Sequence, residues 1–186
     1  MHLDELSKAL STELTSSIDE KNYTKPASVL IVIFDSEPKI LMTKKSSNLK
    51  IHAGEIAFPG GKFDDQDGDL LDTSLRETRE EISLGIRRDQ VIGQLNPVTT
   101  LNSGFTIIPY VAVVNRLPQL KDNPEVETIL HIPMIPFLKT LANDPDPAHK
   151  SIQEMYIFTY NDHLVWGASA RMLKQIVDVL SKKNLL

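Results

Sequence analysis

The chain has 186 residues, 41% of them hydrophobic and 24% charged, which is enough for one globular domain with a full core. A formal net charge of -5 disfavours binding to polymeric nucleic acid or to an anionic membrane surface, and the lack of cysteine excludes disulfides and thiolate catalysis. We see no secretory signal and no apolar run near the ~20 residues of a membrane-spanning helix. We therefore predict a cytoplasmic protein with one domain over residues 1–186.

Residues 1–16 predict a short amphipathic helix. Four leucines recur in it at helical spacing: Leu3, Leu6, Leu10 and Leu14. Because its polar face is not notably basic, we expect it to pack on its own domain or on a second subunit rather than on a membrane. A homodimer is thus an alternative to a monomer. Residues 17–26 are polar and predict a connection.

A continuous run of β-branched and apolar residues at 29–34 predicts a buried strand. The turn at 35–38 leads into a second predicted strand at 39–43, so the two strands should form a hairpin. The next loop, residues 44–55, contains three lysines and a histidine: Lys44, Lys45, Lys50 and His52. The loop is either an electropositive rim that holds substrate phosphates or a solvated basic loop.

Residues 54–84 combine a glycine-rich turn with an acidic helix. In the turn, Gly60 and Gly61 permit positive backbone dihedrals and a close approach of the backbone to a ligand. The helix should be capped by Asp72 or Thr73. Four of its residues form one apolar or small face at three- and four-residue steps: Leu71, Leu75, Thr78 and Ile82. This face predicts packing against the core.

Three glutamates lie together beside that face: Glu77, Glu80 and Glu81. Glu77 and Glu81 are stacked one turn apart, and their like charges repel. A bound cation would relieve the repulsion, and a site made of oxygens suits Mg²⁺ or Mn²⁺. The alternative is a solvated acidic face that Arg76 and Arg79 partly neutralise.

The rest of the chain alternates strands and helices. Strands are predicted at 90–95, 105–114, 129–132 and 152–160. A short helix at 135–141, an exposed loop at 143–147 and a final helix after residue 167 complete the pattern. One face of the final helix carries four apolar residues: Leu173, Ile176, Val177 and Leu180. Trp166, just before that helix, is predicted to pack in the core, and the alternative is that it lines a ligand pocket.

The turn and helix resemble the Nudix box, Gly-x5-Glu-x7-Arg-Glu-U-x-Glu-Glu-x-Gly-U, in which U is aliphatic. The matching residues are Gly61 and 76–84, with one extra residue in the interval between them. Asp67 stands nearest the first glutamate of the motif, Thr78 replaces an aliphatic residue and Ser83 replaces the second glycine. The Nudix family hydrolyses nucleoside diphosphates linked to another group, with divalent cations. The resemblance implies an α/β (α+β) fold, an α/β/α sandwich with a mixed sheet.

A narrower resemblance covers residues 41–61. They are similar to the signature of the coenzyme A pyrophosphatases of this family, Leu-Leu-Thr-x-Arg-Ser-x3-Arg-x3-Gly-x3-Phe-Pro-Gly-Gly. The spacing is kept, but Met42 replaces a leucine, and Lys45 and Lys50 replace arginines. Because lysine is a point charge and arginine a two-pronged fork, phosphate contact can survive while its geometry changes. Two later segments also resemble this subgroup: residues 103–109 and 166–171.

The resemblance implies hydrolysis of coenzyme A or acyl-coenzyme A to phosphopantetheine and adenosine 3′,5′-bisphosphate. Within the same chemistry, the alternative substrates are ADP-ribose, NADH and dinucleotides. Outside it, the alternatives are a Nudix module that senses a nucleotide without cleaving it, and an acidic helix that only contacts another protein. All three glutamates of the box are present, which favours the enzyme.

The resemblance also implies a metal site for Mg²⁺ or Mn²⁺. Its candidate ligands are the carboxylates of Glu77, Glu80 and Glu81 and the carbonyl of Gly61. The ion would neutralise phosphate oxygens and activate a water for attack at phosphorus. Arg76 would brace the loop and the glutamates rather than contact the substrate.

The partner implied is a small-molecule nucleotide substrate. Its candidate contacts are Lys45, Lys50, Gly60 and Gly61. Glu125 is the candidate general base, with Glu127 as the second choice, because an acidic residue beyond the box often serves this role in the family.

Overall fold

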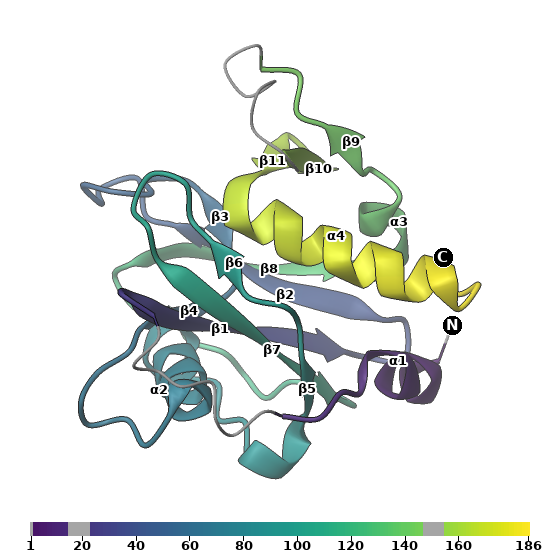
Figure 1. Ribbon diagram of the computed structural model, residues 1–186, viewed down its shortest axis with the longest axis horizontal. Helices are drawn as coiled ribbons and strands as arrows, with labels where there is room; N and C mark the ends of the chain where they lie inside the picture. Colours follow the sequence, from purple (N-terminus) through teal and green to yellow (C-terminus); the bar gives the residue numbers. More distant parts are fainter. Residues whose placement is uncertain (1, 15–22, 147–154) are drawn as a thin grey trace.

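The computed structural model describes residues 2–14, 23–146 and 155–186, and it packs a mixed sheet between two layers of helices (Figure 1). The α-helices are α1 (Leu3–Leu10), α2 (Leu70–Ile82), α3 (Met134–Leu138) and α4 (Gly167–Lys182), and a short 3₁₀ helix, η2, spans Arg88–Gln90. The strands of the main sheet are β1 (Pro26–Phe34), β2 (Lys39–Lys45), β3 (Ile56–Ala57), β4 (Gly60–Lys62), β5 (Val91–Gln94), β6 (Val98–Thr99), β7 (Thr106–Val114) and β8 (Val126–Pro133). A second, small sheet contains β9 (Ala142–Asn143), β10 (Tyr156–Tyr160) and β11 (His163–Val165).

The central strand β1 explains the mixed sheet. It pairs parallel with β7 and antiparallel with β2. Side chains alternate along a strand, so Ile31 and Ile33 pack in the core under α1 and α4, whereas Leu30 and Val32 pack in the core under α2. Helices therefore cover both faces, as Figure 1 shows, and the predicted α/β/α sandwich is confirmed. The predicted hairpin is confirmed too, with Ile33 opposite Ile40.

Several predicted boundaries shift. The strand predicted to end at residue 43 continues to Lys45, the strand predicted at 129–132 is the longer β8, and the helix predicted at 135–141 is α3. Within the loop predicted at 143–147, Asn143 belongs to β9. Leu14 lies beyond the end of α1, and residues 15–22 and 147–154, which include parts of the predicted connection and of the strand at 152–160, lie outside the described residues.

Helix α2 begins earlier than predicted. Its N-cap is Asp69, whose side chain accepts a hydrogen bond from the Asp72 amide at 2.8 Å, so the prediction of Asp72 or Thr73 as cap is wrong. The helix starts at Leu70, whose buried side chain extends the core face, so the extended residue Asp69 becomes the cap. Arg88 lies 2.6 Å from the Asp69 carboxylate and also contacts Asp72. The predicted core face is confirmed, since its four residues are buried: Leu71, Leu75, Thr78 and Ile82.

The prediction that Trp166 packs in the core is wrong. Its side chain is 42% exposed, and Val165, at the end of β11, fills the core position instead. Trp166 comes one residue later in extended backbone, as the N-cap of α4, so its side chain turns outward. The apolar face of α4 is confirmed, with Leu173, Ile176 and Leu180 fully buried. No helix in the described part of the chain has both the length and the apolar character needed to cross a membrane.

Candidate active site

The glycine turn brings strand β4 against both β1 and α2. A Cβ on Gly60 would lie 2.3 Å from the Ser28 carbonyl oxygen of β1. A Cβ on Gly61 would lie 2.4 Å from the carboxyl carbon of Glu77 on α2. At Gly60 the obstacle is the backbone of β1 and the φ is 153°, so only glycine fits there. At Gly61 a larger side chain would displace the Glu77 carboxylate. We predicted that the glycine turn lets a ligand approach the backbone closely. In this structure, the group that approaches the backbone at Gly61 is the Glu77 carboxylate.

Arg76 joins the loop before α2 to the glutamates on it. Its Nε and Nη2 donate to the two oxygens of Asp67 at 2.8 and 2.9 Å. Its Nη1 donates to Glu77 at 2.9 Å and to Glu80 at 3.2 Å. These charge-assisted contacts lower the pKa of Asp67 to about 2. Arg76 therefore occupies the bracing position, and its fork is directed at carboxylates.

Glu81 is the buried member of the acidic cluster. Its side chain is 4% exposed, and its Oε1 lies 2.6 Å from the Lys45 ammonium. Its Oε2 is buried and has no hydrogen-bond partner in the structure. Burial raises the pKa of Glu81, Lys45 opposes this shift, and the charges of Glu77 and Glu125 add to it. The site thus presents one buried carboxylate oxygen without a hydrogen-bond partner among the described residues.

The neighbouring lysines of β2 serve different carboxylates. The pairing of β2 with β8 shifts register between Lys44 and Lys45, and such irregularities re-aim side chains. Lys44 lies 2.6 Å from Glu127, whereas Lys45 reaches Glu81. Glu127 also accepts a hydrogen bond from the Ser47 amide at 3.3 Å, and the Lys44 contact lowers the pKa of Glu127. The second candidate base is therefore already paired.

The other predicted residues are more exposed. Glu125, the first candidate base, is exposed, its carbonyl accepts a hydrogen bond from the Ser46 amide at 2.8 Å, and its charge contributes to the raised pKa of Glu81. The Glu80 side chain is 57% exposed and contacts Arg76. Lys50 is exposed and does not line the adjoining pocket.

The oxygen donors fit a hard divalent cation, although the glutamates are now held by protein cations. Within residues 2–14, 23–146 and 155–186, no three His, Asp or Glu side chains converge as a preformed metal site. Arg76 donates to Glu77 and Glu80, and Lys45 donates to Glu81, so each of the three carboxylates already contacts a protein cation. The unsatisfied Oε2 of Glu81 and the all-oxygen donor set are what Mg²⁺ or Mn²⁺ requires.

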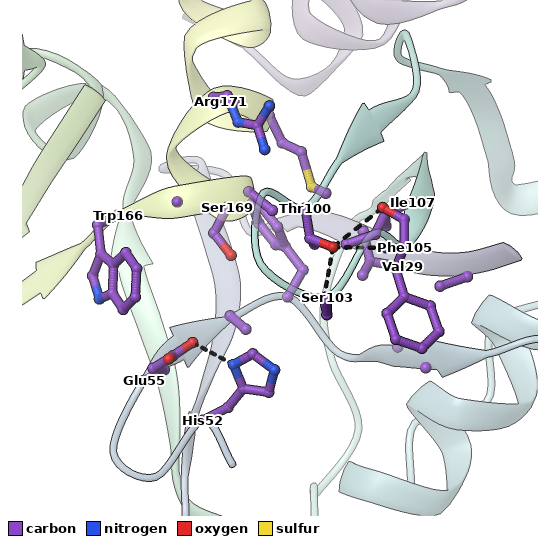
Figure 2. Close-up of a pocket in the computed structure, with 18 of the residues that line it drawn as sticks. Val29, His52, Glu55, Thr100, Ser103, Phe105, Ile107, Trp166, Ser169 and Arg171 are labelled. Carbon is purple, nitrogen blue, oxygen red and sulfur yellow. Dashed lines mark hydrogen bonds and ion pairs between the residues drawn. The ribbon is translucent and has the colours of Figure 1, made fainter. Parts of the chain in front are cut away.

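A pocket of about 710 Å³ opens beside this cluster. Gly60, Gly61 and Lys45 belong to its lining, and most of the remaining wall is apolar. Figure 2 shows Trp166, Ser169 and Arg171 on the side of α4, with the hydrogen-bonded pair of His52 and Glu55 (2.9 Å) below them. Three large apolar side chains in the lining are well exposed: Ile51, Leu101 and Trp166.

The sequence model of the NUDIX domain matches residues 24–161, most of the chain. The chain belongs to the Nudix family. It is 33% identical over 158 residues to the uncharacterized Nudix hydrolase NudL of Photorhabdus laumondii, which covers 83% of this chain and 84% of the relative. Nudix hydrolases are pyrophosphohydrolases that act on phosphorus-containing anhydrides, and this chain belongs to that class of enzymes.

Solved Nudix structures share the fold at low identity. The MutT/nudix family protein from Enterococcus faecalis has a TM-score of 0.62 at 12% identity, over 92% of this chain and 66% of that one. A bifunctional NMN adenylyltransferase/ADP ribose pyrophosphatase from Francisella tularensis, complexed with AMP and a manganese ion, has a TM-score of 0.50 at 14% identity, over 86% of this chain and 41% of that one.

Gly61 and Lys45 line the pocket and contact Glu77 and Glu81 behind it, whereas the three glutamates and Lys50 are not part of the lining. The sequence analysis placed Asp67 beside the Nudix motif but assigned it no role. The signal that could have predicted its contact with Arg76 is a carboxylate just before a helix that carries an arginine. It also missed Ile51, Lys62 and Leu101 as lining residues. Only the folded chain brings these three together, because they come from separate loops and a strand end.

Proposed function

We propose that this Nudix hydrolase cleaves the pyrophosphate bond of coenzyme A or an acyl-coenzyme A, releasing a phosphopantetheine and adenosine 3′,5′-bisphosphate. The observation that carries the proposal is the placement of the pocket. The candidate phosphate-binding residues Gly61 and Lys45 adjoin a largely apolar cavity of about 710 Å³. A substrate with a pyrophosphate and a long, weakly polar arm matches this combination. The signature at residues 41–61 supports the same substrate.

The roles of the acidic residues follow from their surroundings. Glu81, Glu77 and Glu80, with the carbonyl of Gly61, would hold Mg²⁺ or Mn²⁺, and the manganese in the Francisella neighbour supports this class of ion. The bound cation would supply charge neutralisation at the phosphate oxygens and a more acidic water. Arg76 would keep Glu77 and Glu80 aligned through its fork.

Proton transfer is proposed for Glu125. It is exposed, lies near Glu81 and is free of the lysine contact that holds Glu127. An exposed carboxylate beside the buried cluster can accept the proton of the attacking water and return it to solvent. Lys45 would place its positive charge at the pocket end where the pyrophosphate lies, once it leaves Glu81. Gly60 and Gly61 would offer backbone contacts, and Lys50 would reach only a part of the substrate outside the pocket.

The alternatives within the family are ADP-ribose, NADH and dinucleotides as substrates, and a sensor without catalysis. AMP in the Francisella neighbour supports a small-molecule nucleotide as the ligand class. The single domain, the cytoplasmic location, the lack of nucleic acid and membrane partners, and the homodimer stay predictions.

The deciding experiment is product analysis by mass spectrometry. The purified full chain is incubated with Mg²⁺, and separately with Mn²⁺, against coenzyme A, ADP-ribose, NADH and a diadenosine polyphosphate. We expect coenzyme A to yield the two stated products, and Glu81→Gln to abolish the reaction. Cleavage of only another substrate would overturn the coenzyme A assignment, and nucleotide binding without cleavage would favour the sensor.

A further inference from the structure

Two lysine side chains meet at one aromatic ring on the pocket wall. The Lys25 ammonium lies 5.6 Å from the centre of the Phe105 ring, and the Lys62 ammonium lies 5.2 Å from it. Both distances fall within the ~6 Å range of cation–π contacts. Phe105 and Lys62 line the pocket beside Gly61. None of these three residues belongs to the acidic cluster.

The backbone holds the three residues together. They sit at the same end of three adjacent strands, because β1 pairs with β4 on one side, with Ala27 opposite Lys62, and with β7 on the other side. The Thr106 amide donates to the Lys25 carbonyl at 2.9 Å. The cluster is therefore set by sheet pairing rather than by a chance encounter of surface side chains.

The loop before β7 keeps the ring in place. The Phe105 amide donates to the Thr100 hydroxyl at 2.8 Å, and the Thr100 amide donates to the Phe105 carbonyl at 2.8 Å. The Thr100 hydroxyl also lies 2.7 Å from the Ser103 hydroxyl, and the Lys25 ammonium donates to the Ser103 carbonyl at 2.9 Å. Figure 2 shows Thr100, Ser103 and Phe105 gathered on this wall.

The positive charge at the ring is not neutralised by the protein. In the described part of the chain, no carboxylate lies within ion-pair distance of Lys25 or Lys62, whereas Lys45 and Arg76 are paired with glutamates. Both lysine side chains are exposed, so a ligand can reach them. An anion bound at the ring would gain charge-assisted hydrogen bonds from either ammonium group.

We propose that Lys25, Lys62 and Phe105 form a second anion subsite, which binds a phosphate monoester on the ribose of the substrate. The inference rests on the proposed function, because it assumes a nucleoside diphosphate derivative in the pocket. Lys62 directly follows Gly61, a candidate pyrophosphate contact. The backbones of the two residues are therefore separated by the rise of one strand residue, ~3.3 Å. A ribose phosphate is separated from the 5′-pyrophosphate by one sugar ring, and the Phe105 ring offers an apolar surface to that sugar or its base.

The test compares matched substrates that differ by one phosphate. kcat/KM is measured for coenzyme A and 3′-dephospho-coenzyme A with wild type, with the double variant Lys25→Met/Lys62→Met, and with Lys139→Met, an exposed lysine outside the pocket lining, as control. We expect wild type and the control to prefer coenzyme A by about tenfold or more, as charge-assisted contacts allow. The double variant should lose this preference and retain its rate on the dephosphorylated substrate.

A second measurement separates the subsite from the reaction. Calorimetry compares the binding of adenosine 3′,5′-bisphosphate with that of AMP, without metal, to the same three proteins. Tighter binding of the bisphosphate that only the double variant loses supports the subsite, even if neither coenzyme A substrate is cleaved and the proposed function fails. Equal binding of the two nucleotides to wild type, or an equal loss for both substrates in the double variant, overturns it.

Discussion

The ammonium of Lys45 lies 2.6 Å from Oε1 of Glu81, with side chains 15% and 4% exposed, and the other oxygen of Glu81 has no partner in the part of the chain that the structure describes. A buried carboxylate that loses its only counterion is strongly destabilised. We expect Lys45→Met to lower the free energy of unfolding of the metal-free protein by about 3 kcal/mol, measured by urea denaturation with a chelator. Lys44→Met, which breaks the more exposed pair with Glu127, should cost less than about 1 kcal/mol, and equal losses would contradict this account.

The same pair makes a prediction for metal binding. Lys45 competes with a cation for Glu81, so Lys45→Met should bind Mn²⁺ more tightly than wild type does. The expected readout is a larger rise in unfolding temperature on adding Mn²⁺, with paramagnetic resonance of free Mn²⁺ as the direct measurement. Glu81→Gln is the matched control and should lose most of the rise. An identical response in wild type and both variants would show that Mn²⁺ does not bind at Glu81.

The ion pair of Asp67 and Arg76 predicts that the stability of the protein depends on pH in the acid range. The pKa of Asp67 falls from 3.8 to about 2 on folding, because Arg76 donates to it. Its stabilisation is therefore complete above pH 3.8 and is lost as the pH falls through about 2. Asp67→Asn should lower the free energy of unfolding by up to about 2 kcal/mol at neutral pH and by much less near pH 2. Asp122→Asn, on an exposed loop, should differ little from wild type throughout.

Ser83 is the residue that stands where the Nudix box has its second glycine. It ends α2 with a left-handed φ of 57°, which costs a residue with a Cβ about 1 kcal/mol. Ser83→Gly should therefore stabilise the protein by about 0.5–1 kcal/mol in urea denaturation, with activity unchanged. Ser181→Gly, within α4, should destabilise it by a similar amount, since that position is right-handed helix. Destabilisation by Ser83→Gly would show that the hydroxyl matters more than the backbone.

Substitution of Trp166 should change substrate binding more than the stability of the fold. Because its side chain is 42% exposed at the pocket, Trp166→Ala should change the free energy of unfolding by less than about 1 kcal/mol. It should raise KM for a long-chain acyl-coenzyme A several-fold, through lost apolar contact, with little change in kcat. Leu164→Ala, exposed to a similar degree but outside the pocket lining, should leave KM unchanged. A large loss of stability in Trp166→Ala would restore the core role that we first predicted.

Local patterns predicted the parts of the fold that depend on local periodicity. The apolar run at 29–34 predicted a strand buried on both faces, and the four-residue apolar face of α2 predicted that this helix packs on the core. The start of α2 was predicted too late, because the apolar face was counted from Leu71, whereas Leu70 is also buried and Asp69 caps the helix before it. The prediction for Trp166 was wrong because it rested on the residue type, since tryptophan is usually buried. The direction of its side chain is instead set by its position directly after the buried Val165. Likewise, Lys25 and Lys62 reach the Phe105 ring only when β4 and β7 pair with β1.

The crowding around Gly60 and Gly61 means that two parts of the pocket lining tolerate mutation differently. On the β4 side, a methyl group at Gly60 would meet the backbone of β1, and one at Gly61 would displace the Glu77 carboxylate, so mutation there is constrained. On the opposite side, Leu101 and Trp166 project from a loop and a helix start, and their size can change without moving a box glutamate. New substrates can therefore be acquired by changes on one wall, with the hydrolytic residues of the other inherited intact.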